Sequence, residues 1–290
     1  VGLGMLAYAA LAEELGAALV PEPLIPAVLA AALLEGEALE QHISGARLVL
    51  PAWQDRREAL LPEAPLTIED GRLTAVRHGV PVAAGADDFL VIGPGRAVLV
   101  AADAPGVAVA AHGTQDGASV ATVTFERAPG RALAADPRPA FAEAALATGA
   151  YLLGLMEAAL AMTTDYLKTR VQFGKVIGSF QALQHMAVEL QLEVELTRAS
   201  VEDAAMVWDR DGMTDGSLAA VSRAKARAAR AALRVTREAI QLHGGIGFTD
   251  EHDIGLYLRK AMVVAAQFGS AGAHQARYAA LKPARQETAA

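Results

Sequence analysis

Residues 169–186 read TRVQFGKVIGSFQALQHM and interrupt a region whose apolar residues otherwise recur at helical spacing. This stretch places Arg170, Phe173, Gly174 and Gly178 close together in the sequence. A glycine inside a helix costs about 1 kcal/mol relative to alanine. The two glycines therefore indicate either a break between helices or a close approach of the backbone to another group.

The composition excludes several classes of protein and site. A length of 290 residues exceeds one ordinary domain of about 150 residues, which predicts two or three domains. Acidic residues outnumber basic ones by 33 to 25, and no dense Lys/Arg cluster is present, so nucleic acid is not an expected partner. The absence of cysteine excludes disulfides and thiolate chemistry, and the spacing of the seven histidines predicts no metal site.

The N-terminal stretch VGLGMLAYAALAEELGAALVPEP, residues 1–23, is apolar but does not have the pattern of a targeting segment. Glu13 and Glu14 lie in its middle, and no basic flank precedes its apolar part. These features are typical of neither a signal peptide nor a membrane span. We therefore expect a soluble, cytoplasmic protein.

Three segments of the chain differ in pattern. Residues 1–46 show helical spacing around a proline-rich turn, which predicts a short N-terminal helical domain. Residues 47–134 contain short Val-, Ile- and Thr-rich runs separated by Asp-Gly, Pro-Gly and Gly signals, which predicts an antiparallel β domain. Residues 135–290 are amphipathic and poor in proline, which predicts an antiparallel bundle of four or five long helices.

A second glycine-rich stretch, QLHGGIGFTDEHDIGLYLR at residues 241–259, also interrupts the helical pattern. We expect Gly244 and Gly245 to end a helix that begins near Ser217, and Thr249 to cap the next helix. Taken alone, the stretch is typical of a corner between two helices. The functional alternative is that the glycines let backbone N–H groups approach a phosphate or a flat ring, while Arg170 supplies a bidentate charge.

Together the two stretches resemble the motifs R-x-Q-F-G-x-x-I-x-x-F-Q and Q-x-x-G-G-x-G-[FY]-x-x-E of the acyl-CoA dehydrogenase family. The order of helices, β domain and helical bundle is also that of the family, and AEELG at residues 12–16 is similar to its first-domain helix. The matching residues are Arg170, Gln172, Phe173, Gly174, Ile177, Phe180 and Gln181 in the first stretch, and Gln241, Gly244, Gly245, Gly247, Phe248, Glu251 and Arg259 in the second.

The resemblance implies a cofactor site. Residues at the positions of Arg170 and Gln181 hold the diphosphate and adenosine of FAD in the family, and those of Gln241, Gly244 and Gly245 complete this pocket. Gln172, Phe173 and Gly174 belong to the same motif and are expected to contribute to it. The resemblance further implies that these groups reach the FAD of a neighbouring subunit.

The catalytic base of the family is missing from its usual position. Members remove the α proton of an acyl-CoA thioester with a positioned, desolvated glutamate. Here Phe268 stands in its place, preceded by Gln267 and followed by the matching Gly269-Ser270. In a minority of members the base lies about 26 residues before the motif arginine, and this position is Ala144, with Ala145 beside it.

Glu143 is the nearest carboxylate to this second position. A shift of one residue rotates a side chain by about 100° around a helix, which points Glu143 elsewhere. An exposed glutamate in the first turn of a helix, where it suits the helix dipole, is the simpler interpretation. The flavin-ring segments of the β domain are also absent, and only the hairpin signal Glu69-Asp70-Gly71 remains.

We interpret the chain as the non-catalytic subunit of a heteromeric FAD-dependent acyl-CoA dehydrogenase, such as a heterotetramer. A homologous partner chain would carry the catalytic glutamate, and electrons would pass to a separate acceptor. By analogy, the substrate of this lipid metabolism is a CoA thioester from steroid degradation. Two alternatives stay open: a self-sufficient homo-oligomeric dehydrogenase that uses a base such as Glu143, and a flavin-free helical scaffold.

Two other features of the bundle have ordinary interpretations. The run RAKARAARAALRVTRE, residues 223–238, predicts a solvated helix face, with a CoA phosphate or an acidic partner as the alternative. Met206 and Trp208 lie on a helical stripe and are predicted to lie in the core.

Overall fold

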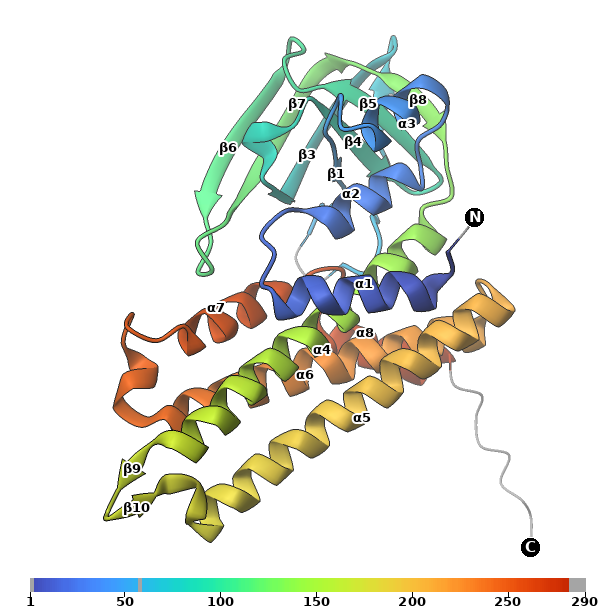
Figure 1. The fold of residues 1–290 in the computed structure, drawn as a ribbon. Coiled ribbons are helices and arrows are strands. Elements are labelled where there is room, and N and C mark those ends of the chain that lie inside the picture. The colour runs from blue at the N-terminus through green and yellow to red at the C-terminus, as the bar shows by residue number, and fades with distance from the viewer. Residues whose placement is uncertain (1–2, 57–58, 282–290) are drawn as a thin grey trace, which may run out of the picture. The chain divides into compact units, whose positions relative to one another are not determined.

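The computed structural model describes residues 3–56 and 59–281 and divides the chain into two compact units (Figure 1). The β unit comprises residues 21–144, and the helical unit comprises residues 1–20 and 145–290. The first helix of the chain therefore groups with the C-terminal helices. The finer division into residues 1–46, 47–134 and 135–290 stays a prediction.

The β unit contains two four-stranded sheets and two short helices. The helices are α2 (Leu24–Ala31) and α3 (Gly36–Ile43). One sheet has the order β1 (Val49–Ala52), β4 (Asp88–Gly93), β5 (Arg96–Ala101), β8 (Arg131–Ala134). The other has the order β2 (Thr67–Glu69), β3 (Arg72–Pro81), β7 (Ser119–Pro129), β6 (Val107–Gly113). Among the described strands of these sheets, β1 and β4 pair in parallel and the remaining pairs are antiparallel, as predicted for most of the unit.

The core of the β unit follows from the alternation of side chains along the strands. On β7 every second residue from Ala121 to Phe125 is buried. Phe125 meets Phe89 of β4 edge to face, with ring centroids 5.9 Å apart. The β2–β3 hairpin turns at Asp70 and Gly71, which both have positive φ, so the Asp-Gly signal correctly predicted this turn.

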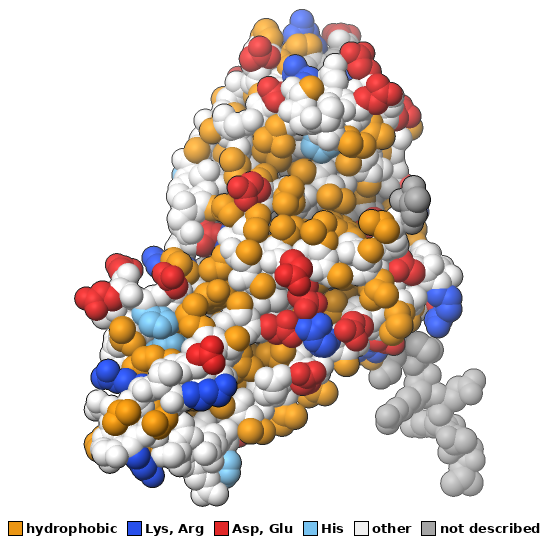
Figure 2. Space-filling view, in the orientation of Figure 1, with side chains coloured by type: hydrophobic (Ala, Val, Ile, Leu, Met, Phe, Trp, Pro, Cys, Tyr) orange, Lys and Arg blue, Asp and Glu red, His pale blue; other side chains and the backbone are white. Residues whose placement is uncertain are grey.

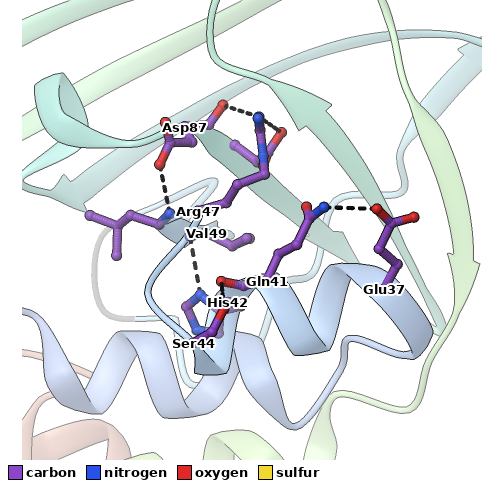
Figure 3. A network of polar contacts seen from close by, with 9 residues as sticks. Glu37, Gln41, His42, Ser44, Arg47, Val49 and Asp87 are labelled. Carbon is purple, nitrogen blue, oxygen red and sulfur yellow. Dashed lines mark hydrogen bonds and ion pairs between the residues drawn. The ribbon is translucent and has the colours of Figure 1, made fainter.

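Hydrogen bonds and an ion pair link the segment between α3 and β1 to the start of β4 (Figure 3). His42 accepts a hydrogen bond from the backbone N–H of Val49, at 3.2 Å. Arg47 binds both carboxylate oxygens of Asp88, at 2.6 and 2.9 Å, and the N–H of Leu48 donates to Asp87. The bidentate geometry fixes where β1 enters the sheet.

The helical unit is built around α6 (Asp215–His243), which packs against α5 (Gln181–Asp211), α7 (Ile254–Val264) and α8 (Ala271–Leu281). Many residues of α6 are buried alanines, whose small side chains let neighbouring helices approach. Thr214 caps α6 in a capping box with Ser217, so this helix begins two residues earlier than Ser217.

The long helix α4 (Arg138–Thr169) crosses α1 (Met5–Ala17) at two glycines. A Cβ atom on Gly16 would lie 1.9 Å from the carbonyl oxygen of Tyr151, and one on Gly154 would lie 1.9 Å from that of Glu13. Asp209 of α5 accepts hydrogen bonds from the first N–H groups of α1, at 2.5 and 3.0 Å. These contacts explain why α1 belongs to the helical unit.

α4 has the length and hydropathy of a membrane-spanning helix, but 78% of its most apolar window is buried within the protein. A core helix of a folded domain has the same properties.

Both explanations of the interrupted stretch at residues 169–186 are correct. After α4 the chain forms a small hairpin of β9 (Val171–Gln172) and β10 (Lys175–Val176), a 3-10 turn, and then α5. Phe173 and Gly174 make the turn of the hairpin with φ of 56° and 75°. A Cβ atom on Gly178 would lie 2.7 Å from the carbonyl oxygen of Leu167, so this glycine allows the chain to pack against the end of α4.

Two predictions about the helical unit were wrong. Thr249 does not cap α7, which begins at Ile254. The hydroxyl of Thr249 instead donates to the carbonyl of Ile246 within the preceding turn. Met206 is 54% exposed, whereas Trp208 is buried as predicted. Gly244 ends α6 with φ of 65°, as predicted.

Candidate functional site

Stacked aromatic rings bring the two glycine-rich stretches together at one end of the helical unit (Figure 1). The ring of Tyr166 stacks on that of His243, with centroids 4.6 Å apart and an interplanar angle of 25°. Tyr166 lies one turn before Arg170, and His243 directly precedes Gly244. The stacking therefore joins the end of α4 to the end of α6, about 70 residues further along the chain.

His243 is a residue of this site that sequence reasoning missed. It is 2% exposed, its Nδ1 donates to the carbonyl oxygen of Ala239 at 2.7 Å, and its Nε2 has no hydrogen-bond partner among the described residues. The ring of His252 lies 4.5 Å away. Burial lowers the pKa of His243, which keeps its ring neutral at pH 7. The signal in the sequence was a histidine at the apolar end of a helix, directly before two glycines.

All eight predicted cofactor-binding residues are exposed. Phe173 is 91% exposed at the tip of the hairpin. Within residues 3–56 and 59–281, the guanidinium of Arg170 makes no ion pair or hydrogen bond. The exposed residues are Arg170, Gln172, Phe173, Gly174, Gln181, Gln241, Gly244 and Gly245.

The hairpin keeps its shape through contacts between its side chains. The ring of Phe173 meets that of Phe180 edge to face at 6.2 Å, and the ammonium group of Lys175 lies 4.0 Å from the centroid of Phe180. At the end of α6, Cβ atoms on Gly244 and Gly245 would meet nothing within 4 Å. The surface at these glycines is therefore open to an approaching group.

The loop between α7 and α8 carries the position that the sequence resemblance predicts for the family base. The residue there is Phe268, which is 6% exposed and has φ of 53°. His274 donates to the carbonyl oxygen of Phe268 at 2.9 Å, and Lys225 donates to those of Ala265 and Gly269 at 2.9 and 3.1 Å. No motif or spacing in the sequence indicated that Lys225 and His274 bind this loop.

Burial dominates the electrostatics around this loop. Lys225 and His274 are both 0% exposed. Burial lowers the pKa of Lys225 to about 7, and it lowers the pKa of His274 to about 3 with help from the nearby charges of Lys225 and Arg277. Position 268 itself carries no group that can accept a proton.

The second possible base position is also occupied by apolar side chains. Ala144 and Ala145 are each 2% exposed. Glu143 is half-buried and lies in the second turn of α4, so the expectation of an exposed glutamate in the first turn was wrong. The physical reason is that the helix begins at Arg138, directly after Pro137, which moves Glu143 one turn further into the helix.

Comparison with known proteins agrees with this architecture. Residues 137–280 match the family model of the acyl-CoA dehydrogenase C-terminal domain. The structure of the Tcur3481-Tcur3483 steroid ACAD is similar with a TM-score of 0.86 and 32% identity, covering 96% of this chain and 81% of that one. The chain belongs to the acyl-CoA dehydrogenase family. The fold class and the family resemblance predicted from the sequence are thereby confirmed.

Two other similar proteins show the extent of the similarity. The ChsE4-ChsE5 complex from Mycobacterium tuberculosis is similar with a TM-score of 0.85 and 30% identity, covering 98% of this chain and 82% of that one. Acyl-CoA dehydrogenase IpdE2 of Mycobacterium tuberculosis is 40% identical over 126 residues. That alignment spans 43% of this chain and 37% of the length of IpdE2.

Proposed function

We propose that this chain is the non-catalytic subunit of a heteromeric FAD-dependent acyl-CoA dehydrogenase. The observation that carries the proposal is a contrast between two sites. The predicted FAD-tail residues are exposed, and the guanidinium of Arg170 has no partner in the described chain, whereas the family base position holds a buried phenylalanine. A chain of this kind supplies groups to a neighbour's cofactor but lacks a base for its own.

The exposed groups fit the diphosphate and adenosine of FAD. The free guanidinium of Arg170 matches the bidentate geometry of a phosphate, and Lys175 adds a second positive charge on the same hairpin. The open surface at Gly244 and Gly245 lets a bound group approach the backbone there without meeting a side chain. Phe173, at 91% exposure, offers a flat apolar surface of the kind on which an adenine stacks.

In this proposal the residues of the chain bind and orient, and those of the partner move the proton. Arg170 and the glycines would hold the diphosphate and adenosine of the cofactor. FAD would supply the acceptor for the hydride that leaves the β carbon of an acyl-CoA thioester. The partner's glutamate would take the α proton, and a separate acceptor would receive the electrons.

Two features support a heteromeric assembly and a bulky substrate. The similar structures include the ChsE4-ChsE5 complex and a steroid ACAD, which favours a homologous partner chain and a steroid-derived CoA thioester. Residues 1–46, 47–134 and 135–290 would then be the counterparts of the family's N-terminal helical, middle β and C-terminal helical domains. A heterotetramer located in the cytoplasm is the expected form.

The test is the flavin content of the chain purified alone and of the chain co-expressed with a homologous dehydrogenase encoded beside it. We expect visible flavin absorbance only in the mixed sample, at one FAD per pair of unlike chains. Arg170→Ala is expected to lower the flavin content without preventing association. Arg96→Ala, which removes an arginine that is also exposed, from β5, serves as the matched control.

Three outcomes would contradict the proposal. Stoichiometric flavin in the chain alone, with turnover of an acyl-CoA, would favour a self-sufficient enzyme and make Glu143 the first residue to replace. Unchanged flavin content in the Arg170→Ala complex would make the motif structural. A mixed complex without any flavin would favour the helical scaffold.

A further inference from the structure

One arginine of the β unit is buried. Arg77 of β3 is 3% exposed, and it is the one arginine that the structure buries within residues 3–56 and 59–281. On the face of the β unit that Figure 2 shows, acidic and basic side chains lie at the surface, as ionised groups usually do. Burial lowers the pKa of Arg77, but a guanidinium keeps its proton near neutral pH. The interior of the β unit therefore holds a permanent positive charge.

Most of the hydrogen-bonding capacity of Arg77 is unused. Its Nη1 donates to the backbone carbonyl of Val76 at 2.9 Å. Its Nε and Nη2 are buried and have no hydrogen-bond partner among the described residues. These two nitrogens form the edge of a guanidinium that binds a carboxylate through both oxygens, and Arg47 uses the same edge to bind Asp88. The edge of Arg77 that suits a carboxylate is thus open.

The carboxylate of Asp55 lies near Arg77 without pairing with it. One oxygen, Oδ2, accepts hydrogen bonds from the backbone N–H groups of Glu63, at 3.1 Å, and of Ala64. The other oxygen, Oδ1, is buried and has no partner among the described residues. The charge of Asp55 partly offsets the effect of burial on the pKa of Arg77. Two donors and one acceptor are therefore unsatisfied on two neighbouring side chains of opposite charge.

These two side chains lie where the chain leaves β1 and passes beside β3. The backbone N–H of His78, the residue after Arg77, donates to the carbonyl oxygen of Gln54 at 2.8 Å and forms an isolated bridge. Trp53 is buried, whereas Gln54 and Asp55 are half-buried. The unsatisfied atoms therefore lie close to the surface of the β unit, within reach of a small solute.

The other charged side chains of this region do not satisfy these atoms. Arg56 and Glu63 are exposed and pair with each other at 2.5 Å. His78 is exposed, and its Nδ1 lies 3.2 Å from Oγ1 of Thr122 on β7. Neither β1 nor the segment 120–125 of β7, which pairs with this part of β3, carries a charged residue. The missing partner therefore comes from outside the described chain.

A carboxyl group matches all three atoms at once. Buried polar groups without a protein partner usually hold a water molecule or a ligand. Water does not neutralise a guanidinium, whereas the two oxygens of a carboxylate accept from Nε and Nη2 of Arg77 and do so. One proton shared with Oδ1 of Asp55 removes the repulsion between the two carboxylates and satisfies this oxygen as well.

We propose that Arg77 and Asp55 form a binding site in the β unit for the carboxyl group of a small organic acid, which binds together with one proton. The guanidinium edge of Arg77 holds both oxygens of the acid. Oδ1 of Asp55 and the acid share the proton, which is taken up from the solvent. The site lies within the β unit and does not rest on the proposed sharing of FAD.

The experiment titrates the full chain with sodium acetate at about pH 6 and about pH 7.5, with sodium chloride keeping the ionic strength constant. In a Trp208→Phe background the fluorescence reports on Trp53, two residues before Asp55. Acetate up to about 50 mM should give a saturable change, because a ligand of this size reaches a millimolar dissociation constant. This constant should rise by up to about tenfold per pH unit, because binding takes up one proton. Saturating acetate should raise the melting temperature of the β unit by about 2 °C or more.

Three variants and one control locate the response. Arg77→Met should abolish it at both pH values, and the fold should persist because a buried charge is removed. Arg77→Lys keeps the charge without the two-pronged edge and should raise the dissociation constant about tenfold or more. Asp55→Asn should bind acetate with no pH dependence, because its amide nitrogen donates where the shared proton lay. Arg72→Met removes an exposed arginine from the same strand and should leave the response unchanged.

Three results would overturn the inference. Wild-type chain that does not respond to acetate at about pH 6 would leave the unsatisfied atoms to buried water. An unchanged response in folded Arg77→Met, checked by circular dichroism, would place acetate elsewhere. Wild-type binding that is equal at both pH values, and equal for sodium nitrate, would indicate a general anion site without the shared proton.

Discussion

Lys225 should make the stability of the helical unit rise with pH well above neutrality. Its side chain is 0% exposed, and among the described residues its hydrogen-bond partners are two backbone carbonyl oxygens, of Ala265 and Gly269. A neutral amine has two N–H groups and can satisfy both carbonyls without carrying a charge. Burial accordingly lowers the pKa of Lys225 from 10.5 to about 7.

The sign of the effect follows from proton binding. Between about pH 7 and pH 10 the unfolded chain holds a proton on Lys225 that the folded chain does not, so the free energy of unfolding rises with pH. The slope reaches about 1.4 kcal/mol per pH unit, and over the interval between the two pKa values the gain approaches about 5 kcal/mol. Below about pH 7 both states are protonated, and the cost of burying the ammonium group is fully present.

Lys225→Met should remove this slope. At about pH 9.5 the variant should be less stable than the wild type, because each carbonyl left without its partner costs about 1–3 kcal/mol. Near pH 6.5 the difference in the free energy of unfolding between wild type and variant should shrink or change sign, because the wild type then buries a charge and the variant does not. Lys168→Met, which removes a lysine with a 68% exposed side chain from α4, should leave the slope unchanged.

Urea denaturation followed by tryptophan fluorescence would measure these values. The chain has two tryptophans, Trp53 in the β unit and Trp208 in α5, so a Trp53→Phe background makes fluorescence report on the helical unit alone. Parallel profiles for the wild type and Lys225→Met from about pH 7 to pH 10 would refute the reasoning, since Lys225 would then keep an ordinary pKa in the folded state.

Two further predictions concern the contacts of α1 within the helical unit. Gly16→Ala should destabilise this unit by more than about 2 kcal/mol in urea denaturation, because the added methyl would overlap a backbone carbonyl of α4. Gly272→Ala, at an exposed position of α8, should instead stabilise the unit by up to about 1 kcal/mol. Arg198→Met should destabilise the unit by about 2–4 kcal/mol near pH 7, because it leaves Glu13 and Glu157 close together without their shared cation. Burial already raises the pKa of Glu157, so its carboxyl takes up a proton more readily as the pH falls. The loss of stability in Arg198→Met should therefore be smaller at about pH 5 than at pH 7. An equal loss at both pH values would contradict this explanation.

The sequence by itself determined the features that depend on neighbouring residues. The helical and β segments followed from apolar spacing, the β2–β3 turn from Asp70-Gly71, and the end of α6 from Gly244. The two motifs with Arg170 and Gly245 were sufficient to identify the family. These features were predictable because local backbone preference and side-chain periodicity act over a few residues.

Local rules failed where the surrounding structure decided the outcome. Thr249 is a good cap residue, but the turn that precedes α7 extends to Asp253, so the helix begins only at Ile254. Met206 has the spacing of a core residue, but its side chain is 54% exposed on the surface of α5. Helical periodicity distinguishes one face from another without indicating which face is covered.

Only the tertiary structure decided which distant segments meet. The stacking of Tyr166 on His243, the crossing of α1 and α4 at Gly16, and the binding of the α7–α8 loop by Lys225 join residues that lie from 40 to more than 130 positions apart. The run that contains Lys225 was predicted to be a solvated face, yet this lysine is buried because two carbonyls from another part of the chain lie within its reach. Such contacts depend on where the whole backbone passes in space, and apolar spacing and turn chemistry carry no information about that path.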